Sequence, residues 1–163
     1  MKVQIQTRLS DGGGEEYFPL IEKVLNKVMQ LENIPWPGEA SVLLVEEDEI
    51  RAINKRYRAL DEVTDVLSFP LLETPAYRIK KPKFHEYDPE TGNVLLGDII
   101  LCVSRAKQQA AEFGHSISRE IAYLAAHSLL HLIGYEHEAD EESRLFMRQK
   151  EEAALEALGL TRE

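Results

Sequence analysis

The chain contains 163 residues, of which 44% are hydrophobic and 29% are charged, proportions typical of one globular domain and not of a fibre or a disordered segment. Its one cysteine, Cys102, excludes an intrachain disulfide framework. No apolar run approaches the roughly 18 residues of a membrane span, and residues 1–6 lack the apolar core of a signal peptide. We therefore expect a cytoplasmic protein without a membrane partner.

The formal net charge of −10 argues against nucleic-acid binding by bulk charge. The charge is unevenly distributed, because residues 51–85 contain eight Lys or Arg and only four Asp or Glu. This middle segment is the part of the chain best suited to bind an anion.

The first half of the chain predicts two strands and two helices. Apolar and polar side chains alternate over residues 2–8, which indicates a strand. Apolar residues recur at intervals of three and four over residues 21–31, which predicts an amphipathic helix. Residues 40–46 form a short apolar run typical of a buried strand, and Asp48 can cap the helix that follows.

Two more strands flank a long connection. Residues 65–69 predict a third strand ended by Pro70, and residues 97–103 predict a fourth. Between them, residues 71–95 contain three prolines and few periodic apolar residues. Connections longer than roughly 12–15 residues are often functional, so this loop is a candidate lid.

Three helices complete the chain. The first spans about 104–114, the second is capped by Ser116 or Ser118 and reaches Ile133, and the last covers about 140–158. Strands interleaved with helices predict one α+β (layered α/β) domain over residues 1–163. We expect a mixed sheet of about four strands packed with about five helices, the long histidine-bearing helix being central.

Three histidines in the second half predict a metal site. His127 and His131 lie four residues apart, which places both imidazoles on one face of a helix. Gly134 can adopt the left-handed conformation that ends a helix, and the chain reversal brings His137 toward the same ion. Three imidazoles and an open position are the ligand set of a catalytic zinc site, although other divalent metals can occupy such a site.

The histidine spacing also matches the His-Glu-x-x-His signature of metalloproteases, in which the glutamate is the general base. Ser128 occupies that position here. A hydroxyl cannot replace a carboxylate that accepts the proton of water, so the sequence disfavours peptidase activity.

The chain resembles the bacterial YbeY family of metal-dependent endoribonucleases, also called the rRNA maturation factor family. The resemblance rests on segments that occur in the same order over most of the domain: Asn54-Lys55-Arg56-Tyr57-Arg58, Asp61, Thr64-Asp65-Val66-Leu67-Ser68-Phe69-Pro70, Leu96-Gly97-Asp98-Ile99 and residues 127–137. Two features depart from the family: Glu136 replaces the usual aspartate, and the 71–95 connection is longer.

The resemblance implies one zinc ion on His127, His131 and His137, and it places Arg58 at the functional arginine of the family. It further implies processing of ribosomal RNA, especially the 3′ end of the small-subunit RNA, and ribosome quality control. RNA and the ribosome, or a small-subunit ribosomal protein, are the partners that follow from this resemblance.

Four further residues have roles that the residue types themselves suggest. The guanidinium of Arg58 can donate two hydrogen bonds to a phosphate and stabilise its charge in the transition state. Ser68 and Phe69 could line a substrate-binding cleft, Phe69 by stacking on a base, although a core role suits Phe69 equally. Asp98 could orient a histidine as a hydrogen-bond acceptor, or make a hydrogen bond at the strand end.

The sequence thus predicts a zinc-dependent endoribonuclease acting on single-stranded RNA. Zinc hydroxide could attack the phosphorus, or it could take the proton of the ribose 2′-hydroxyl. Two alternatives remain open: a metzincin-like metalloprotease without the usual glutamate base, and a non-catalytic ribosome-assembly module that uses the metal for stability.

Overall fold

A four-stranded mixed sheet forms the middle of the protein. A computed structural model describes residues 1–136 and 140–160. The strand order is β1 (Lys2–Thr7), β2 (Gly38–Val45), β4 (Val94–Cys102) and β3 (Val66–Pro70). The first three strands are parallel, and β3 pairs antiparallel with β4 at one edge of the sheet. This architecture confirms the predicted α+β class.

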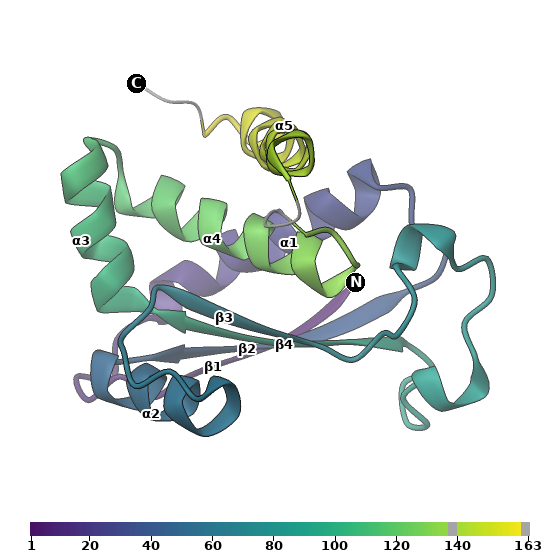
Figure 1. Ribbon diagram of the computed structural model, residues 1–163, viewed down its shortest axis with the longest axis horizontal. Helices are drawn as coiled ribbons and strands as arrows, with labels where there is room; N and C mark the ends of the chain where they lie inside the picture. Colours follow the sequence, from purple (N-terminus) through teal and green to yellow (C-terminus); the bar gives the residue numbers. More distant parts are fainter. Residues whose placement is uncertain (137–139, 161–163) are drawn as a thin grey trace.

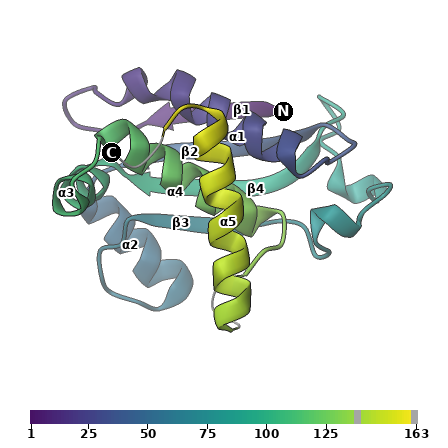
Figure 2. The same ribbon diagram turned by 90° about the horizontal axis from the view of Figure 1, so that it is seen from above.

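Five α-helices cover the sheet unequally (Figure 1). α1 (Phe18–Leu31) and α4 (Ile117–Leu132) pack on one face, whereas α2 (Glu47–Arg58) packs on the other. α3 (Val103–Phe113) follows β4 at one end of the sheet, and α5 (Glu141–Ala157) crosses over α1 and α4 as an outer layer (Figure 2). No helix of the described residues is long and apolar enough to cross a membrane.

α4 is the central helix of the fold. It contacts α1, α3 and α5 as well as strands β3 and β4, so eleven of its sixteen residues are buried. A helix surrounded in this way has to be apolar on nearly every side, and its central place agrees with the prediction. Ser116 caps its first turn by accepting a hydrogen bond from the backbone of Arg119. At its other end Gly134 adopts a positive φ of 112°.

The predicted elements agree with the structure to within a few residues. The main difference is β4, which begins at Val94 and not at residue 97. Its first residues pair with the start of β2, before a register irregularity between Glu39 and Ala40. At this irregularity β4 has one extra residue, which interrupts the alternation of side chains. The alternating pattern therefore did not extend back to Val94.

The long connection between β3 and β4 is partly ordered by the core. It contains two 3-10 helices, Ala76–Arg78 and Phe84–Glu86. The backbone N–H of Ala76 donates to the carbonyl of Ile133 at 2.8 Å, and the indole of Trp36 donates to the carbonyl of Ile79 at 3.0 Å. The connection is therefore attached both to the end of α4 and to the segment after α1. Its role as a lid stays a prediction.

Gly97 provides a test of how closely β3 approaches β4. It has a φ of +140°, and a Cβ there would lie 2.2 Å from the backbone oxygen of Phe69. Gly97→Ala should therefore lower the free energy of unfolding by about 4 kcal/mol or more, a loss as large as that of a severe core substitution. Gly114→Ala is the matched control, because Gly114 also has a positive φ (+71°) but nothing lies within 4 Å.

The control should cost only about 1–2 kcal/mol, the penalty of a left-handed conformation. Urea denaturation of both variants measures the difference. Equal losses in the two variants would show that β3 can move away from Gly97 without penalty.

Candidate functional site

A cleft of about 990 Å³ opens beside the exposed edge of the sheet. Its walls come from the end of α2, the connection to β3, β3 itself, α4 and the segment after β3. Four of the residues that the sequence singled out line it together: Arg58, Ser68, His127 and His131. Residues separated by 73 positions in the chain thus share one cleft because α4 packs across β3.

The two histidines face each other across one turn of α4. Their Nε2 atoms are 3.1 Å apart, and the ring planes are nearly perpendicular at 89°. The third predicted ligand, His137, lies outside the described residues. Within the described parts of the chain, no three His, Cys, Asp or Glu side chains form a group that could hold an ion.

The other nitrogen of each imidazole is occupied by an acceptor. Nδ1 of His127 contacts the carboxylate of Glu151 on α5, and Nδ1 of His131 lies 2.8 Å from the backbone carbonyl of Tyr135. A carbonyl can only accept, so Nδ1 of His131 carries the proton, and the buried carboxylate favours the same tautomer in His127. In this tautomer each Nε2 atom presents a lone pair to the cleft.

This donor set fits a metal ion. Two lone pairs that face each other repel unless a cation lies between them. Two nitrogens that bind one tetrahedral zinc ion at about 2.0–2.1 Å are separated by about 3.3 Å, close to the 3.1 Å between these Nε2 atoms. Histidine ligands of metals commonly donate their second N–H to a carboxylate or a carbonyl, as both do here.

Tyr123 extends the site along α4, one turn before His127. Its ring stacks on His127 with centroids 5.9 Å apart, and it lines the cleft. Burial, followed by the nearby carboxylate of Glu151, raises the pKa of Tyr123 to about 12. The phenol is therefore neutral and able to donate at any physiological pH.

Arg58 stands on the opposite wall, at the last residue of α2. Its Nη2 donates to the carbonyl of Ser68 at 2.7 Å, and its guanidinium lies 5.4 Å from the centre of the Phe69 ring. The side chain is exposed, and these two contacts hold it on the rim. Within residues 1–136 and 140–160 no hydrogen bond of the other guanidinium N–H groups is found, so this rigid fork can still donate to a ligand.

Phe69 requires a correction to the sequence-based prediction. Alternation along β3 directs Ser68 to the face that carries α4, whereas Phe69 packs with Leu67 on the face that carries α2. Its ring makes an edge contact with Tyr57 at 5.7 Å. Phe69 does not line the cleft, so it is not placed to stack on a substrate base there. Its ring instead packs against the guanidinium of Arg58.

Asp98 is also placed differently from the prediction. It lies on the face of β4 shared with Ile100 and Cys102, away from α4, and its carboxylate contacts the hydroxyl of Ser41. The acceptors that orient His127 and His131 are Glu151 and the Tyr135 carbonyl instead. Asp98 therefore makes a hydrogen bond between two strands in the middle of β4, and not at a strand end as the second of the two predicted roles had it.

Glu151 is the functional residue that the sequence analysis missed. It is buried, with 3% of its surface exposed, on the face of α5 that also buries Met147, Ala154 and Leu155. A glutamate at the apolar positions of an amphipathic helix is unusual, because a buried carboxylate needs a partner. That position was the available signal, but the sequence alone does not identify which side chain it meets.

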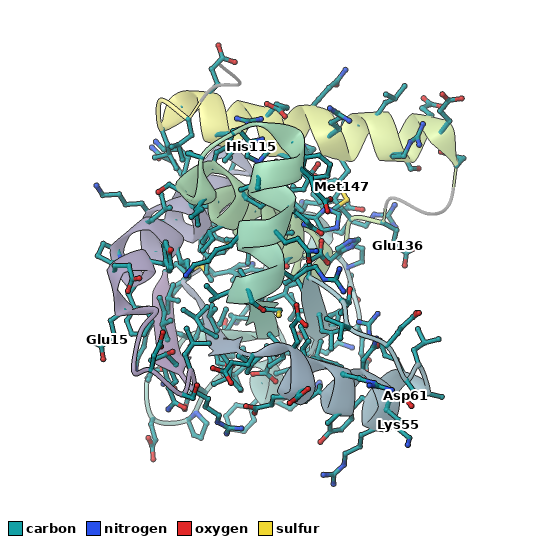
Figure 3. All side chains as sticks on the ribbon, turned by 90° about the vertical axis from the view of Figure 1, so that its left-hand side faces the viewer. Glu15, Lys55, Asp61, His115, Glu136 and Met147 are labelled. Carbon is teal, nitrogen blue, oxygen red and sulfur yellow. The ribbon has the colours of Figure 1, made fainter. Side chains whose placement is uncertain are left out.

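Ser128 and Glu136 occupy opposite environments. Ser128 is fully buried, and its hydroxyl has no hydrogen-bond partner among the described residues. It therefore points into the core and does not line the cleft. Glu136 is exposed on the cleft wall, on the same side of the molecule as Asp61, which follows α2 (Figure 3).

The cleft is acidic. Arg58 is the one cation among the described residues that line it, against four carboxylates: Glu62, Asp65, Glu73 and Glu136. The excess of basic residues over positions 51–85 is therefore not concentrated in the cleft. Of the eight basic residues in this segment, only Arg58 is placed to bind an anion inside the cleft.

Comparison with known proteins places this chain among the endoribonucleases, hydrolases that act on RNA. The chain belongs to the endoribonuclease YbeY family, whose model matches residues 4–159. The resemblance predicted from the sequence motifs is thereby confirmed.

The similarity extends over nearly the whole chain. An endoribonuclease YbeY of Agathobacter rectalis is 44% identical over 152 residues, which cover 90% of this chain and 91% of the relative. One from Lachnospira eligens is 39% identical and covers 99% and 100%. The solution structure of a Thermotoga maritima protein superimposes with a TM-score of 0.60 at 28% identity, covering 94% of this chain and 87% of that one.

The phenol of Tyr123 gives a pH-dependent test of this site. The folded protein holds the proton up to about pH 12, whereas the unfolded chain releases it near the ordinary pKa of about 10. Tyr123 therefore contributes stability that is complete below about pH 10 and is lost as the pH rises toward 12.

Urea denaturation of the wild type and Tyr123→Phe over about pH 8–11 measures this contribution, since other tyrosines cancel in the difference. The advantage of the wild type should be constant at first and fall above about pH 10. A difference that stays constant up to about pH 11 would show that the pKa of Tyr123 is not raised.

Proposed function

We propose that this protein is a zinc-dependent endoribonuclease that cleaves single-stranded RNA, with His127, His131 and His137 as the ligands of one zinc ion. The observation that carries the proposal is the pair of Nε2 atoms of His127 and His131, which lie 3.1 Å apart in the cleft. The Nδ1 atom of each ring contacts an acceptor that orients the imidazole. Membership of an endoribonuclease family supplies the substrate class.

The two walls of the cleft have different roles: one holds the metal ligands, and the other holds the arginine that binds the phosphate. Glu151 and the Tyr135 carbonyl hold the two imidazoles in the tautomer that presents Nε2. A bound zinc ion would supply Lewis-acid chemistry, lowering the pKa of water and offsetting negative charge on the phosphate. From the opposite wall Arg58 donates hydrogen bonds to a phosphate oxygen whose charge grows in the transition state.

The biological substrate that we propose is ribosomal RNA, with maturation of the 3′ end of the small-subunit RNA as the main reaction. Ribosome quality control, a cytoplasmic location and a ribosomal protein partner belong to the same proposal. The acidic cleft supports a role for such a partner, because anionic walls weaken the binding of free RNA.

Substitution of the three histidines tests the metal site. Elemental analysis of wild type should give close to one equivalent of zinc, and His127→Ala, His131→Ala or His137→Ala should give far less, because two imidazoles hold zinc weakly. Retention of full zinc content in any one of these variants would show that the substituted residue is not a ligand.

Arg58→Ala and Ser128→Ala form a matched pair for the chemical step. Arg58→Ala should keep the zinc and lower cleavage of a defined single-stranded RNA by about a hundredfold or more, the usual loss when one donor to a transition-state oxygen is removed. Ser128→Ala should keep both zinc and activity, since its hydroxyl is buried away from the cleft.

The same proteins separate the alternatives. A metalloprotease would cleave casein in a chelator-sensitive way with or without Arg58, and a non-catalytic assembly module would bind zinc but cleave neither substrate. Either result would refute the nuclease assignment.

Glu151 provides a prediction about zinc affinity. Glu151→Gln keeps the shape but removes the charge that orients His127, so zinc affinity should fall about 10–100-fold, as for other partners of metal-binding histidines. Glu156→Gln, an exposed change on the same helix, is the control. Competition with a chromogenic chelator measures both constants, and equal affinities would show that Glu151 does not support the ligand.

A further inference from the structure

A run of basic and aromatic side chains lies just outside the cleft, on the connection between β3 and β4. We call residues 77–84 the basic ridge. It carries four cations and two exposed aromatic rings but no acidic residue: Tyr77, Arg78, Lys80, Lys81, Lys83 and Phe84. In Figure 1 the connection projects at the end of the sheet where β3 ends and β4 begins.

The ridge is held to the core at every third residue. Ala76 and Pro82 are buried and Ile79 is half-buried against the main core, whereas the cations between them are exposed. The hydrogen bonds from Ala76 to Ile133 and from Trp36 to Ile79 fix the backbone at the first two of these positions. The cations are therefore presented outward from a fixed backbone, which lowers the entropy that a ligand has to remove.

The cations of the ridge are not neutralised within the described structure, although the guanidinium of Arg78 lies 5.8 Å from the centre of the Tyr77 ring. Arg78, Lys80, Lys81 and Lys83 form no ion pair with any described residue, whereas Arg51 and Lys150 each pair with a carboxylate. The nearest acidic residue in sequence, Glu86, accepts a hydrogen bond from the backbone of Lys83. Four unpaired positive charges on a chain of net charge −10 form a local site for a polyanion.

Aromatic contacts connect the ridge to the histidines. The ring of Tyr77 lies 4.9 Å from that of Tyr135, and the carbonyl of Tyr135 accepts the hydrogen bond from His131. Gly134, which lies between His131 and Tyr135 in the chain, also contacts Pro75 just before the ridge. A Cβ on Gly134 would lie only 2.7 Å from the Cβ of Pro75. The ridge thus begins at the rim of the cleft. Phe84 lies farther along it and is 95% exposed.

We propose that the basic ridge is a docking site for the single-stranded RNA that extends from the cleavage site, with the lysines on its phosphates and Tyr77 and Phe84 stacked on its bases. This inference rests on the proposed function of the cleft. Basic residues interleaved with exposed aromatic rings are the combination by which proteins bind single strands without reading their sequence. The ridge supplies the positive charge that the acidic cleft lacks.

A nucleic acid fits the ridge better than a protein does. The exposed rings are separated by cations and form no continuous apolar patch of the kind that protein partners bury. The side chains Tyr77 and Phe84 lie seven residues apart along an anchored backbone, so they can contact different nucleotides of an extended strand.

The test compares two triple variants with the same change in charge. Lys80→Gln, Lys81→Gln and Lys83→Gln alter the ridge; Lys23→Gln, Lys27→Gln and Lys107→Gln alter α1 and α3. Binding of a fluorescent, 2′-O-methylated 12-nucleotide RNA is measured by anisotropy over a range of salt concentrations. The methyl groups block attack by the ribose but not by zinc hydroxide, so a denaturing gel of each sample shows that the RNA stays intact.

The ridge variant should bind about tenfold or more weakly at low salt, and the slope of log affinity against log salt should fall by about 2, since each phosphate contact on a single strand contributes about 0.7. The control variant should resemble wild type in both quantities. Tyr77→Ala with Phe84→Ala should weaken binding while leaving the salt slope unchanged, because stacking does not release counterions.

Cleavage distinguishes this inference from the proposed function. A dinucleotide substrate is too short to reach the ridge, so the ridge variant should cleave it as wild type does while its KM for the 12-nucleotide RNA rises. Wild-type affinity and salt slope in the ridge variant would overturn the docking site even if the protein cuts RNA. Loss of ribosome binding with unchanged RNA affinity would also overturn it, in favour of a protein partner.

Discussion

The contact between His127 and Glu151 is the constraint on which the site depends. Glu151 is buried in α5, and a carboxylate in that environment is stable only with a hydrogen-bonding partner. Its partner is an imidazole of α4, the helix that packs on the sheet. One interaction therefore links the outermost helix to the tautomer of a histidine, so that packing of α5 and orientation of the site depend on each other.

Most of the fold could be predicted because its elements follow simple periodicities. The histidine pair could also be predicted, since a spacing of four fixes two side chains on one helix face. Phe69 and Asp98 were misplaced for a common reason. The sequence shows that each lies in a strand, but which face of the strand meets α4 depends on the packing of the whole sheet.

The charge of the protein also could not be interpreted from the sequence alone. Residues 51–85 form one basic segment in the chain, but the structure divides it between α2, the cleft wall and the ridge. Arg51 is neutralised by Asp61 at 2.8 Å, whereas the ridge lysines project outward. Electrostatic function is a property of the folded surface, because neighbours in space and not in sequence decide which charges are compensated.

The exposed edge of β3 has a consequence for solubility. An edge strand presents backbone groups that can pair with a strand of another molecule, which leads to aggregation. Here the guanidinium of Arg58 donates a hydrogen bond to the carbonyl of Ser68, and Pro70 has no N–H to pair at the end of the strand. Arg58 thus also protects the edge against intermolecular pairing. A protein that lacks this guanidinium exposes an unpaired acceptor, so its colloidal behaviour changes together with its chemistry.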